Sequence, residues 1–312
     1  MSNHKHVLII GTGSIAKRHF LNISSLKDEI ICYCLSKSGR TIDGCIPFNQ
    51  KENIRFDIVV VASATHFHDS DMYIAISVTK SEGIIFIEKP ISLNIEEAKK
   101  IECEILKKNL RVVVGYDLRY HEGISHLKRI YDEEISVKSN FIYDSRVGQN
   151  LDTWRKNQDN FKSYSYSQEK SGGIVNDLSH EIDLAIYVTG IKKSFSVQNY
   201  QSKIFNETLN DLSKLELSLQ SKDELKRIFI SIDCISHRFY RYIDILTKEK
   251  NYFLDLLSGS YKEFSMGTLV KEIKFENDRN YRNQKMWKEI LSGSDTKLPS
   301  YQESLLMLKN IA

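Results

Sequence analysis

The order of residues near the N-terminus limits what this chain can fold into. Val7–Ile10 is a short apolar run typical of a buried strand, Gly11-Thr-Gly-Ser-Ile-Ala16 follows at once, and helical spacing of apolar residues comes next. The glycines permit a tight turn and a close approach of backbone N–H groups to an anion, which a helix N-terminus attracts. The alternative is a strand-to-helix turn that binds nothing. The residues predicted to hold the pyrophosphate of a dinucleotide are Gly11, Gly13, Ser14, Ile15 and Ala16.

The following residues repeat the strand and helix alternation. Further apolar strands are expected at Ile30–Leu35, Phe56–Ala62, Ile84–Ile87 and Leu110–Val114. Asn94, with Glu97 three residues later, predicts the start of the helix before the last of these strands. Strands that alternate with helices predict a parallel sheet with right-handed crossovers. We therefore expect a doubly wound Rossmann domain over residues 1–118.

The end of the second strand bears on which dinucleotide is bound. About twenty residues after the glycines, an acid would hold the ribose hydroxyls of NAD. Ser36, Lys37 and Arg40 stand there instead. Hydroxyls and cations suit a 2′-phosphate, which favours NADP over NAD. The alternative is a solvated basic loop.

Two further strand ends carry polar residues. Ser63 and His68 follow the strand that ends at Ala62, and Glu88-Lys89-Pro90 follows Ile84–Ile87. Ligands bind at the carboxyl edge of such a sheet. Because proline restricts the backbone of the residue before it, we expect the side chain of Lys89 to have a defined direction. We expect Ser63, His68, Glu88 and Lys89 to contact the cofactor. A surface salt bridge at a strand end is the alternative for Glu88 and Lys89.

The pattern changes in the second half of the chain. Period-two alternation at Ser136–Tyr143, Leu215–Leu219, Ile228–Ile232 and Tyr242–Leu246 predicts consecutive strands. Strands without intervening helices imply an antiparallel sheet with one buried and one open face. The fold class is therefore α/β plus α+β, and the second domain, over residues 119–312, is an open-faced sheet domain with a closing helix near its end.

One amphipathic helix interrupts that sheet pattern. Apolar residues recur at four-residue spacing between Ile174 and Val188, and Gly190 is suited to end the helix. Asp177, His180 and Asp183 follow one another at three-residue spacing and share one face. A histidine beside a carboxylate can pass a proton in either direction near neutral pH. The alternative is a set of surface residues in which the acids favour the helix N-terminus.

Composition excludes several other classes of protein. The formal charge of +3 comes from 44 basic and 41 acidic residues spread along 312 residues, so neither nucleic acid nor a membrane is expected as a partner. Five widely spaced cysteines, without metal-ligand spacing, favour a reducing cytoplasm and no bound metal. The apolar run at Val7–Ile10 is too short for a signal peptide or a membrane span.

Taken together, the motifs resemble the Gfo/Idh/MocA family of NAD(P)-dependent oxidoreductases. The Gly-x-Gly-x-x-Ala turn, Glu88-Lys89-Pro90, Gly115-x-x-x-Arg-Tyr120 and Gly172-Gly-x-x-x-Asp-x-x-His-x-x-Asp183 occur in the family's order, and the segment Phe275–Tyr281 with the helix after it resembles the family's C-terminal region. Asp117 and Ala64 depart from residues common in similar proteins, asparagine and proline respectively.

The resemblance implies a role for each matching residue. Lys89 would stand beside the nicotinamide and the reacting carbon, and similar proteins suggest a cis Lys89–Pro90 bond. His180 would be the acid/base, oriented by Asp177, so the catalytic residues would be Lys89, His180 and Asp177. The residues implied to contact substrate are Arg119, Tyr120, Trp154, Arg155, Asp177, His180 and Asp183.

The resemblance also implies an activity and an assembly. Hydride would pass between the nicotinamide of NADP or NAD and a secondary alcohol of a sugar, cyclitol or nucleotide-linked sugar. Two alternatives are an imine or conjugated double-bond reductase, in which His180 is dispensable, and a non-catalytic nicotinamide-binding sensor. Similar proteins are commonly homodimers or homotetramers, and a large one-sided sheet often needs a partner over its free face.

Overall fold

The chain forms two compact units. The computed structural model describes residues 4–26, 29–136, 140–150, 176, 179–190, 196–202, 212–221, 224–294 and 296–311. The first unit combines Met1–Asp117 with Arg279–Asn310, and the second is Leu118–Asp278. The first boundary falls one residue from the one expected. The C-terminal segment, expected in the second domain, belongs instead to the first unit.

The first unit is built on a six-stranded parallel sheet in the order β3-β2-β1-β4-β5-β6. The central strands are buried on both faces, as an all-parallel sheet requires, with Val7, Leu8 and Val60 fully inaccessible. The strands are β1 (Lys5–Ile10), β2 (Ile30–Leu35), β3 (Ile46–Pro47), β4 (Phe56–Val61), β5 (Thr79–Ile87) and β6 (Arg111–Val114).

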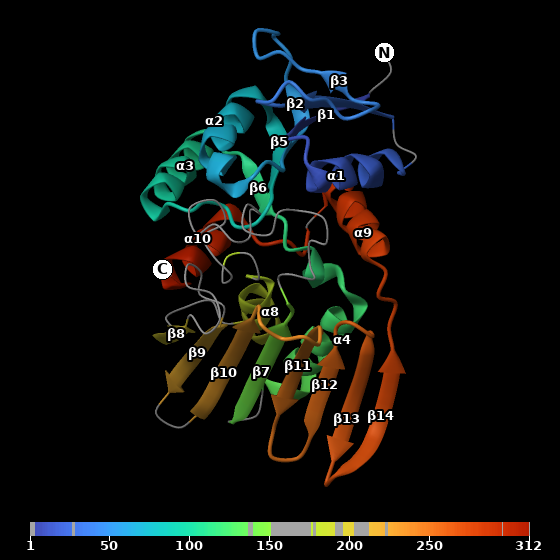
Figure 1. Ribbon diagram of the computed structural model, residues 1–312, viewed down its shortest axis with the longest axis vertical. Helices are drawn as coiled ribbons and strands as arrows, with labels where there is room; N and C mark the ends of the chain where they lie inside the picture. The colour runs from blue at the N-terminus through green and yellow to red at the C-terminus, as the bar shows by residue number, and fades with distance from the viewer. Residues whose placement is uncertain are drawn as a thin grey trace. The chain divides into compact units, whose positions relative to one another are not determined.

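Helices cover both faces of this sheet. They are α1 (Ser14–Ser24), the 3₁₀ turn η1 (Thr65–Phe67), α2 (His68–Val78), α3 (Ile95–Lys107), α9 (Arg279–Ser292) and α10 (Tyr301–Ile311). α2 packs with α3 and α1 packs with α9 (Figure 1). Right-handed crossovers that run in opposite directions from β1 and β4 place α1 and α2 on opposite faces. The Asn94 side chain accepts hydrogen bonds from the N–H groups of Glu96 and Glu97, which confirms the N-cap of α3.

Backbone contacts explain why the C-terminal segment joins the first unit. Val113 pairs with Ser300 in an antiparallel bridge, and Val114 N–H donates to Pro299 O over 2.9 Å. The Arg111 guanidinium donates to Gly293 O over 3.0 Å. Trp287 of α9 is fully buried against this unit. The segment thus completes the core of the first unit.

The second unit contains an eight-stranded sheet in the order β14-β13-β12-β11-β7-β10-β9-β8. The pairs are antiparallel as expected, except that β7 and β10 run parallel. The strands are β7 (Phe141–Gly148), β8 (Ser196–Ser202), β9 (Leu212–Ser221), β10 (Glu224–Asp233), β11 (Tyr240–Leu246), β12 (Asn251–Asp255), β13 (Ser260–Ser265) and β14 (Thr268–Lys274). The parallel pair arises because β10 does not follow β7 directly in the chain, so no hairpin fixes its direction.

The described helices of this unit lie over one face of the sheet. They are the 3₁₀ turn η2 (Asp117–Tyr120), α4 (Glu122–Ile130), the π-helical turn η3 (Tyr131–Ile135) and α8 (His180–Thr189). α8 packs on β7 and β10, and α4 packs on β12. The strand expected at Ser136–Tyr143 begins at Phe141, because buried Ile135 continues the apolar face of α4 for one more turn.

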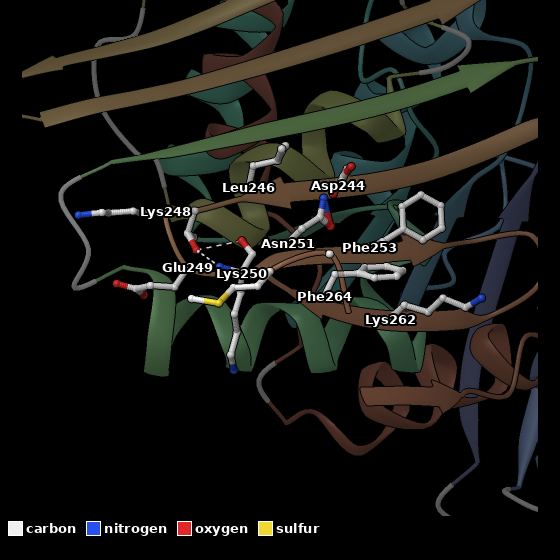
Figure 2. Close-up of a pocket in the computed structure, with 12 residues that line it drawn as sticks. Asp244, Leu246, Lys248, Glu249, Lys250, Asn251, Phe253, Lys262 and Phe264 are labelled. Atoms are coloured by element: carbon white, nitrogen blue, oxygen red, sulfur yellow. Dashed lines mark hydrogen bonds between the residues drawn. The ribbon is translucent and has the colours of Figure 1, made fainter. Parts of the chain in front are cut away.

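No described helix covers the other face of the sheet. Alternate residues of β11 to β13 reach it, including Leu246, Phe253 and Phe264, which line a shallow hollow of about 640 Å³ (Figure 2). The hollow contains none of the residues predicted to bind cofactor or substrate. Among the described helices, none is long and apolar enough to cross a membrane.

Candidate functional site: a strand edge and a histidine helix

The turn after β1 depends on Gly11. Gly11 has a φ of 110°, a conformation that residues with a Cβ rarely adopt. A Cβ at this position would lie 2.6 Å from Ala62 O at the end of β4. The turn therefore lies against the neighbouring strand end, and only glycine permits this approach.

Gly13 leaves the N-terminus of α1 open to a ligand. It is the N-cap residue, no side chain caps the helix, and no acid lies in the first turn. The helical ladder begins with Lys17 N–H donating to Gly13 O, so the N–H groups of residues 14–16 lie outside it. A Cβ on Gly13 would have no heavy atom within 4 Å. This exposed cradle of N–H groups fits a phosphate, and with it the pyrophosphate of a dinucleotide.

The end of β2 gathers hydroxyl groups. Ser36 Oγ lies 3.2 Å from Thr12 Oγ1 and 2.9 Å from Ser38 Oγ, and Arg40 Nε donates to Ser38 Oγ over 3.1 Å. The structure thus brings Ser36 and Arg40 into one exposed cluster beside the glycine turn.

Lys37 points to a different partner. Its ammonium group donates to Ser70 Oγ over 2.7 Å, lies 3.1 Å from the buried carboxylate of Asp71 and stacks over the Phe67 ring. Lys37 therefore connects the β2 end to α2, and of the three predicted residues it is the one most committed to protein contacts.

A chain of hydrogen bonds fixes the carboxylate of Glu88 at the end of β5. The indole Nε1 of Trp287 can only donate, and it does so to His19 Nδ1 over 3.1 Å. His19 Nδ1 is therefore an acceptor, and the proton of the neutral ring lies on Nε2. His19 Nε2 then donates to Glu88 Oε1 over 2.8 Å.

This chain keeps Glu88 ionised beside Lys89. Burial alone would raise the pKa of the Glu88 carboxyl, but the hydrogen bond from His19 and the charge of Lys89 outweigh it, so the pKa lies below its usual range. A Cβ on Gly115 would lie 3.2 Å from Glu88 Oε2, so the carboxylate packs closely over this glycine. Lys89 is partly exposed at the same edge, and the Lys89–Pro90 bond is cis.

His68 is buried behind this edge. It is 1% exposed, with Nδ1 2.8 Å from Pro90 O and Nε2 3.2 Å from Ser63 O. Burial lowers its pKa, although both carbonyl groups oppose this. A neutral ring has one N–H. We assign it to Nδ1, because the distance from Nδ1 to Pro90 O is shorter than that from Nε2 to Ser63 O. His68 thus connects the end of β4 to the residue after Lys89 and holds the two predicted cofactor-contact loops together.

In the second unit, His180 is the first residue of α8, after the N-cap Ser179, and Gly190 ends the helix in the left-handed conformation as expected. Two acids after His180 are paired. Glu181, fully buried, accepts from Arg241 at 2.5 and 3.0 Å, and buried Asp183 accepts from Arg119 at 2.6 to 3.2 Å. These pairs anchor the helix that begins at His180 to the rest of the second unit.

Other predicted positions have different outcomes. Asp177, Trp154 and Arg155 lie outside the described residues, and Tyr120 is buried. Within the described part of the chain, no group of three or more metal-ligating side chains comes together. The structure adds His19, Trp287, Glu181 and Arg241, whose roles depend on packing between distant elements and have no motif in the sequence.

Comparison with known proteins finds a family that the first unit resembles. Residues 5–116 match the family model GFO_IDH_MocA, described as an oxidoreductase family with an NAD-binding Rossmann fold. Over these residues the first unit is similar to the NAD-binding domain of that family. A curated relative, the glucose-6-phosphate 3-dehydrogenase of Bacillus subtilis (strain 168), is 25% identical over 214 residues, which are 64% of this chain and 57% of the relative. The chain spans 34 to 57% of the length of the curated relatives it matches.

Solved structures share the whole fold. An inositol dehydrogenase homologue from Azotobacter vinelandii, complexed with NAD⁺, has a TM-score of 0.79 at 12% identity and covers 100% of this chain and 94% of its own. The UDP-N-acetylglucosamine 3-dehydrogenase from Acidithiobacillus ferrooxidans has a TM-score of 0.76 at 13% identity, with 98% and 95% covered. The two-part architecture expected from the sequence, a Rossmann domain and an open-faced sheet domain, is confirmed.

Proposed function

We propose that this protein is an NAD(P)-dependent oxidoreductase that transfers hydride between the nicotinamide and a secondary alcohol or ketone of a carbohydrate-like substrate. The observation that carries the proposal is the open N-terminus of α1 at Gly13, on the same sheet edge as Glu88 and Lys89. The family match over residues 5–116 supports it. The relatives named for sugar and inositol dehydrogenation support the substrate class.

Each proposed catalytic residue has one task. When bound, the nicotinamide supplies the carbon that accepts or gives up the hydride. His180 takes the hydroxyl proton of the substrate during oxidation and returns it during reduction, with Asp177 orienting the ring. The ammonium group of Lys89 stabilises the negative charge that develops on the reacting oxygen, and this charge is largest in the transition state.

The remaining predicted residues bind the cofactor or the substrate, or hold other residues of the site in place. Gly11, Gly13, Ser14, Ile15 and Ala16 hold the pyrophosphate, and Ser63 lies near the nicotinamide. Glu88 and His68 hold the loop of Lys89. Tyr120, Trp154 and Arg155 remain proposed substrate contacts. Because Arg119 and Asp183 bind each other, we assign them the task of holding α8, which begins at His180.

The preferred dinucleotide is proposed to be NADP. The hydroxyl groups of Ser36 and Ser38 with the guanidinium of Arg40 offer donors to a 2′-phosphate. The bond between Lys37 and Asp71 leaves Arg40 as the main cation of this cluster. Arg40→Gln should therefore weaken NADPH binding about tenfold, the effect of losing one charge-assisted contact of about 1.4 kcal/mol, and leave NADH binding unchanged.

The catalytic assignment is tested with His180→Ala and Lys89→Ala. Hydride transfer is followed by absorbance at 340 nm with a panel of sugars, cyclitols and nucleotide sugars, and cofactor binding is titrated separately. Each variant should lose about a hundred- to ten-thousandfold in turnover while it still binds cofactor. Normal turnover in both variants would contradict the assignment. Bound cofactor without turnover of any substrate by the wild type would favour the sensor alternative.

We further propose a cytoplasmic homodimer or homotetramer. The open face of the second sheet presents partly exposed apolar residues, among them Ile142 and Leu246, which a second copy would cover. Light scattering on a sizing column measures the mass directly. A monomer at micromolar concentration would contradict the proposed assembly, without bearing on the catalytic residues.

A further inference from the structure

Arg18 is a charged residue of α1 to which the proposed function gives no task. It stands four residues after Ser14 and three after Ile15, so the three side chains share one face of the helix. Side chains of an α-helix lean toward its N-terminus, and at 1.5 Å per residue Ser14 is only about 6 Å away along the axis. The guanidinium group of Arg18 is therefore directed toward the open N-terminus of α1.

Three charged groups indicate where this guanidinium lies. Its charge interacts with those of Arg279, Asp117 and Glu88. Glu88 follows β5 and Asp117 follows β6, so the guanidinium lies at the carboxyl edge of the parallel sheet, where α1 also begins. In the order β2-β1-β4-β5-β6, these two strands and β2 are on opposite sides of β1. Arg18 and the predicted 2′-phosphate residues are thus on opposite sides of the glycine turn.

One donor of Arg18 lacks an acceptor. Nη1 is buried and has no hydrogen-bond partner among the described residues. Burial, and then the charge of Arg279, lower the pKa of Arg18, whereas Asp117 and Glu88 raise it through their charges and not through a hydrogen bond. A buried donor without an acceptor destabilises the folded protein, so this group is suited to a ligand that accepts from it.

The helix N-terminus adds to the positive potential around Arg18. It carries partial positive charge, which favours anions and disfavours a guanidinium group directed toward it. The first turn of α1 contains no acid that would compensate. One bound anion would relieve the unpaired donor, the repulsion from Arg279 and the potential of the helix N-terminus together. The diphosphate of the cofactor, proposed to bind one turn away, is such an anion.

We propose that Arg18 binds the diphosphate of the nicotinamide dinucleotide, at the phosphate on the nicotinamide side. A guanidinium group binds phosphate through paired charge-assisted hydrogen bonds. Because Arg18 lies toward β5, whereas the adenosine is proposed to lie at the end of β2, it contacts the phosphate farther from the adenosine. This inference rests on the proposed function and adds to it a residue that contacts NAD and NADP alike.

Arg18→Gln tests the inference by isothermal titration calorimetry with three ligands. NADPH and NADH contain the diphosphate, whereas adenosine 2′,5′-bisphosphate has only the phosphates on the adenosine side of NADP. The variant should bind NADPH and NADH about tenfold more weakly, through loss of one charge-assisted contact of about 1.4 kcal/mol, and the bisphosphate as tightly as the wild type.

Two matched variants accompany it. Lys17→Gln removes a charge from the neighbouring, exposed position of α1 and should leave all three affinities unchanged. Arg40→Gln, at the proposed 2′-phosphate site, should give the opposite pattern, with weaker binding of NADPH and the bisphosphate and unchanged binding of NADH. The two arginines are then assigned to different phosphates of the same cofactor.

Thermal unfolding without ligand separates binding from a structural role. Arg18→Gln removes an unpaired charge, so it should melt no lower than the wild type. A lower melting temperature with unchanged affinity for NADPH and NADH would assign Arg18 to the fold alone and overturn the inference. Inorganic phosphate that binds NADPH-saturated wild type but not the variant would assign Arg18 to a substrate anion and overturn it as well. A wild type that binds neither NADPH nor NADH would instead refute the proposed function.

Discussion

At the residue scale, the most informative contact is the hydrogen-bond chain from Trp287 through His19 to Glu88. It joins residues 268 positions apart and fixes the proton of His19 on Nε2. The carboxylate of Glu88 is then held in one orientation beside Lys89. The orientation of the Glu88 carboxylate, whose charge interacts with that of Lys89, therefore depends on a tryptophan in α9.

Trp287→Phe tests this chain. The change keeps an aromatic ring but leaves the buried His19 Nδ1 without its donor, a loss of about 1–3 kcal/mol. Without the indole donor, the His19 ring is held less firmly in its orientation, which weakens its hydrogen bond to Glu88. We expect a lower free energy of unfolding and a rise in the acidic pKa of the pH–rate profile, because Glu88 loses the contact that lowers its pKa.

His19→Asn is the matched variant for this prediction. An asparagine carbonyl can accept from Trp287 while its amide donates to Glu88. It should therefore retain the wild-type pH–rate profile better than His19→Ala. A profile unchanged in both Trp287→Phe and His19→Ala would show that the chain does not act on Glu88.

A second residue-scale prediction concerns Asp244 on the open sheet face. Asp244 lies directly opposite Asp144 in the register of β11 and β7, and its Oδ1 is buried with no hydrogen-bond partner among the described residues. Burial, and then the charge of Asp144, raise the pKa of Asp244 from 3.8 to about 6. The folded state thus binds this proton more tightly than the unfolded state, so stability falls as the pH rises from about 4 to about 6.

Asp244→Asn removes this dependence. After allowance for solvent screening, the free energy of unfolding should rise by about 1 kcal/mol at pH 7 and change little at about pH 2.5, where Asp244 is protonated in both states. Urea denaturation at the two pH values measures the difference. An equal effect of the variant at pH 7 and at about pH 2.5 would contradict the raised pKa.

The sequence can predict the role of a residue when that role depends on neighbouring residues in the chain, and not when it depends on packing between distant elements. Gly11 could be predicted because a turn between a strand and a helix has few solutions. The hydrogen bond between His19 and Trp287 could not be predicted, because it depends on the packing of two distant helices. The buried pair of Arg119 and Asp183 was likewise hidden, and both residues were interpreted as substrate contacts.

At the scale of elements, α8 is held by two buried ion pairs within three residues of His180. Arg241 pairs with Glu181 and Arg119 with Asp183, and the acid of each pair is almost inaccessible to solvent. A helix anchored in this way has a defined rotation about its axis. The direction of His180 is set by that rotation.

Arg119→Met tests the anchoring. It leaves the carboxylate of Asp183 buried without its charge partner, which should cost about 3–5 kcal/mol of stability. The double change Arg119→Met with Asp183→Leu replaces the pair by apolar contacts and should recover most of that loss. Chemical denaturation of both variants measures the difference. A loss below 1 kcal/mol in Arg119→Met would show that the pair does not anchor α8.

Most elements could be predicted from periodicity, and the exceptions have physical causes. The strands β1, β2 and β4 lie within two residues of their expected bounds, because continuous apolar runs next to turns are unambiguous. The strand predicted from Ser136 started late because the π-helical turn η3 extends the apolar pattern of α4. The parallel pairing of β7 with β10 was missed, because strand direction across a long connection has no signature in the residues themselves.

At the scale of the whole molecule, the chain leaves the first unit at Asp117 and returns to it at Arg279. The domain boundary near residue 118 could be predicted, because the period of apolar residues changes there from a strand and helix alternation to strands alone. The return could not, because the contacts of α9 with the first unit, such as that of Trp287 with His19, have no signature in the sequence. The first unit therefore needs its C-terminal segment to complete both its core and the setting of Glu88.

The central claim is that the open N-terminus of α1 binds the pyrophosphate of a nicotinamide dinucleotide, and Gly13→Asp tests it most directly. The backbone at Gly13 is in an extended conformation that aspartate adopts, and its side chain would enter open space. Aspartate is a favoured N-cap, so the variant should fold with unchanged or higher stability while its carboxylate occupies the phosphate position. Titration with NADPH and NADH by fluorescence should show binding by the wild type and at least a hundredfold weaker binding by the variant, about 2.7 kcal/mol. Equal affinity in a variant that folds normally would contradict the account.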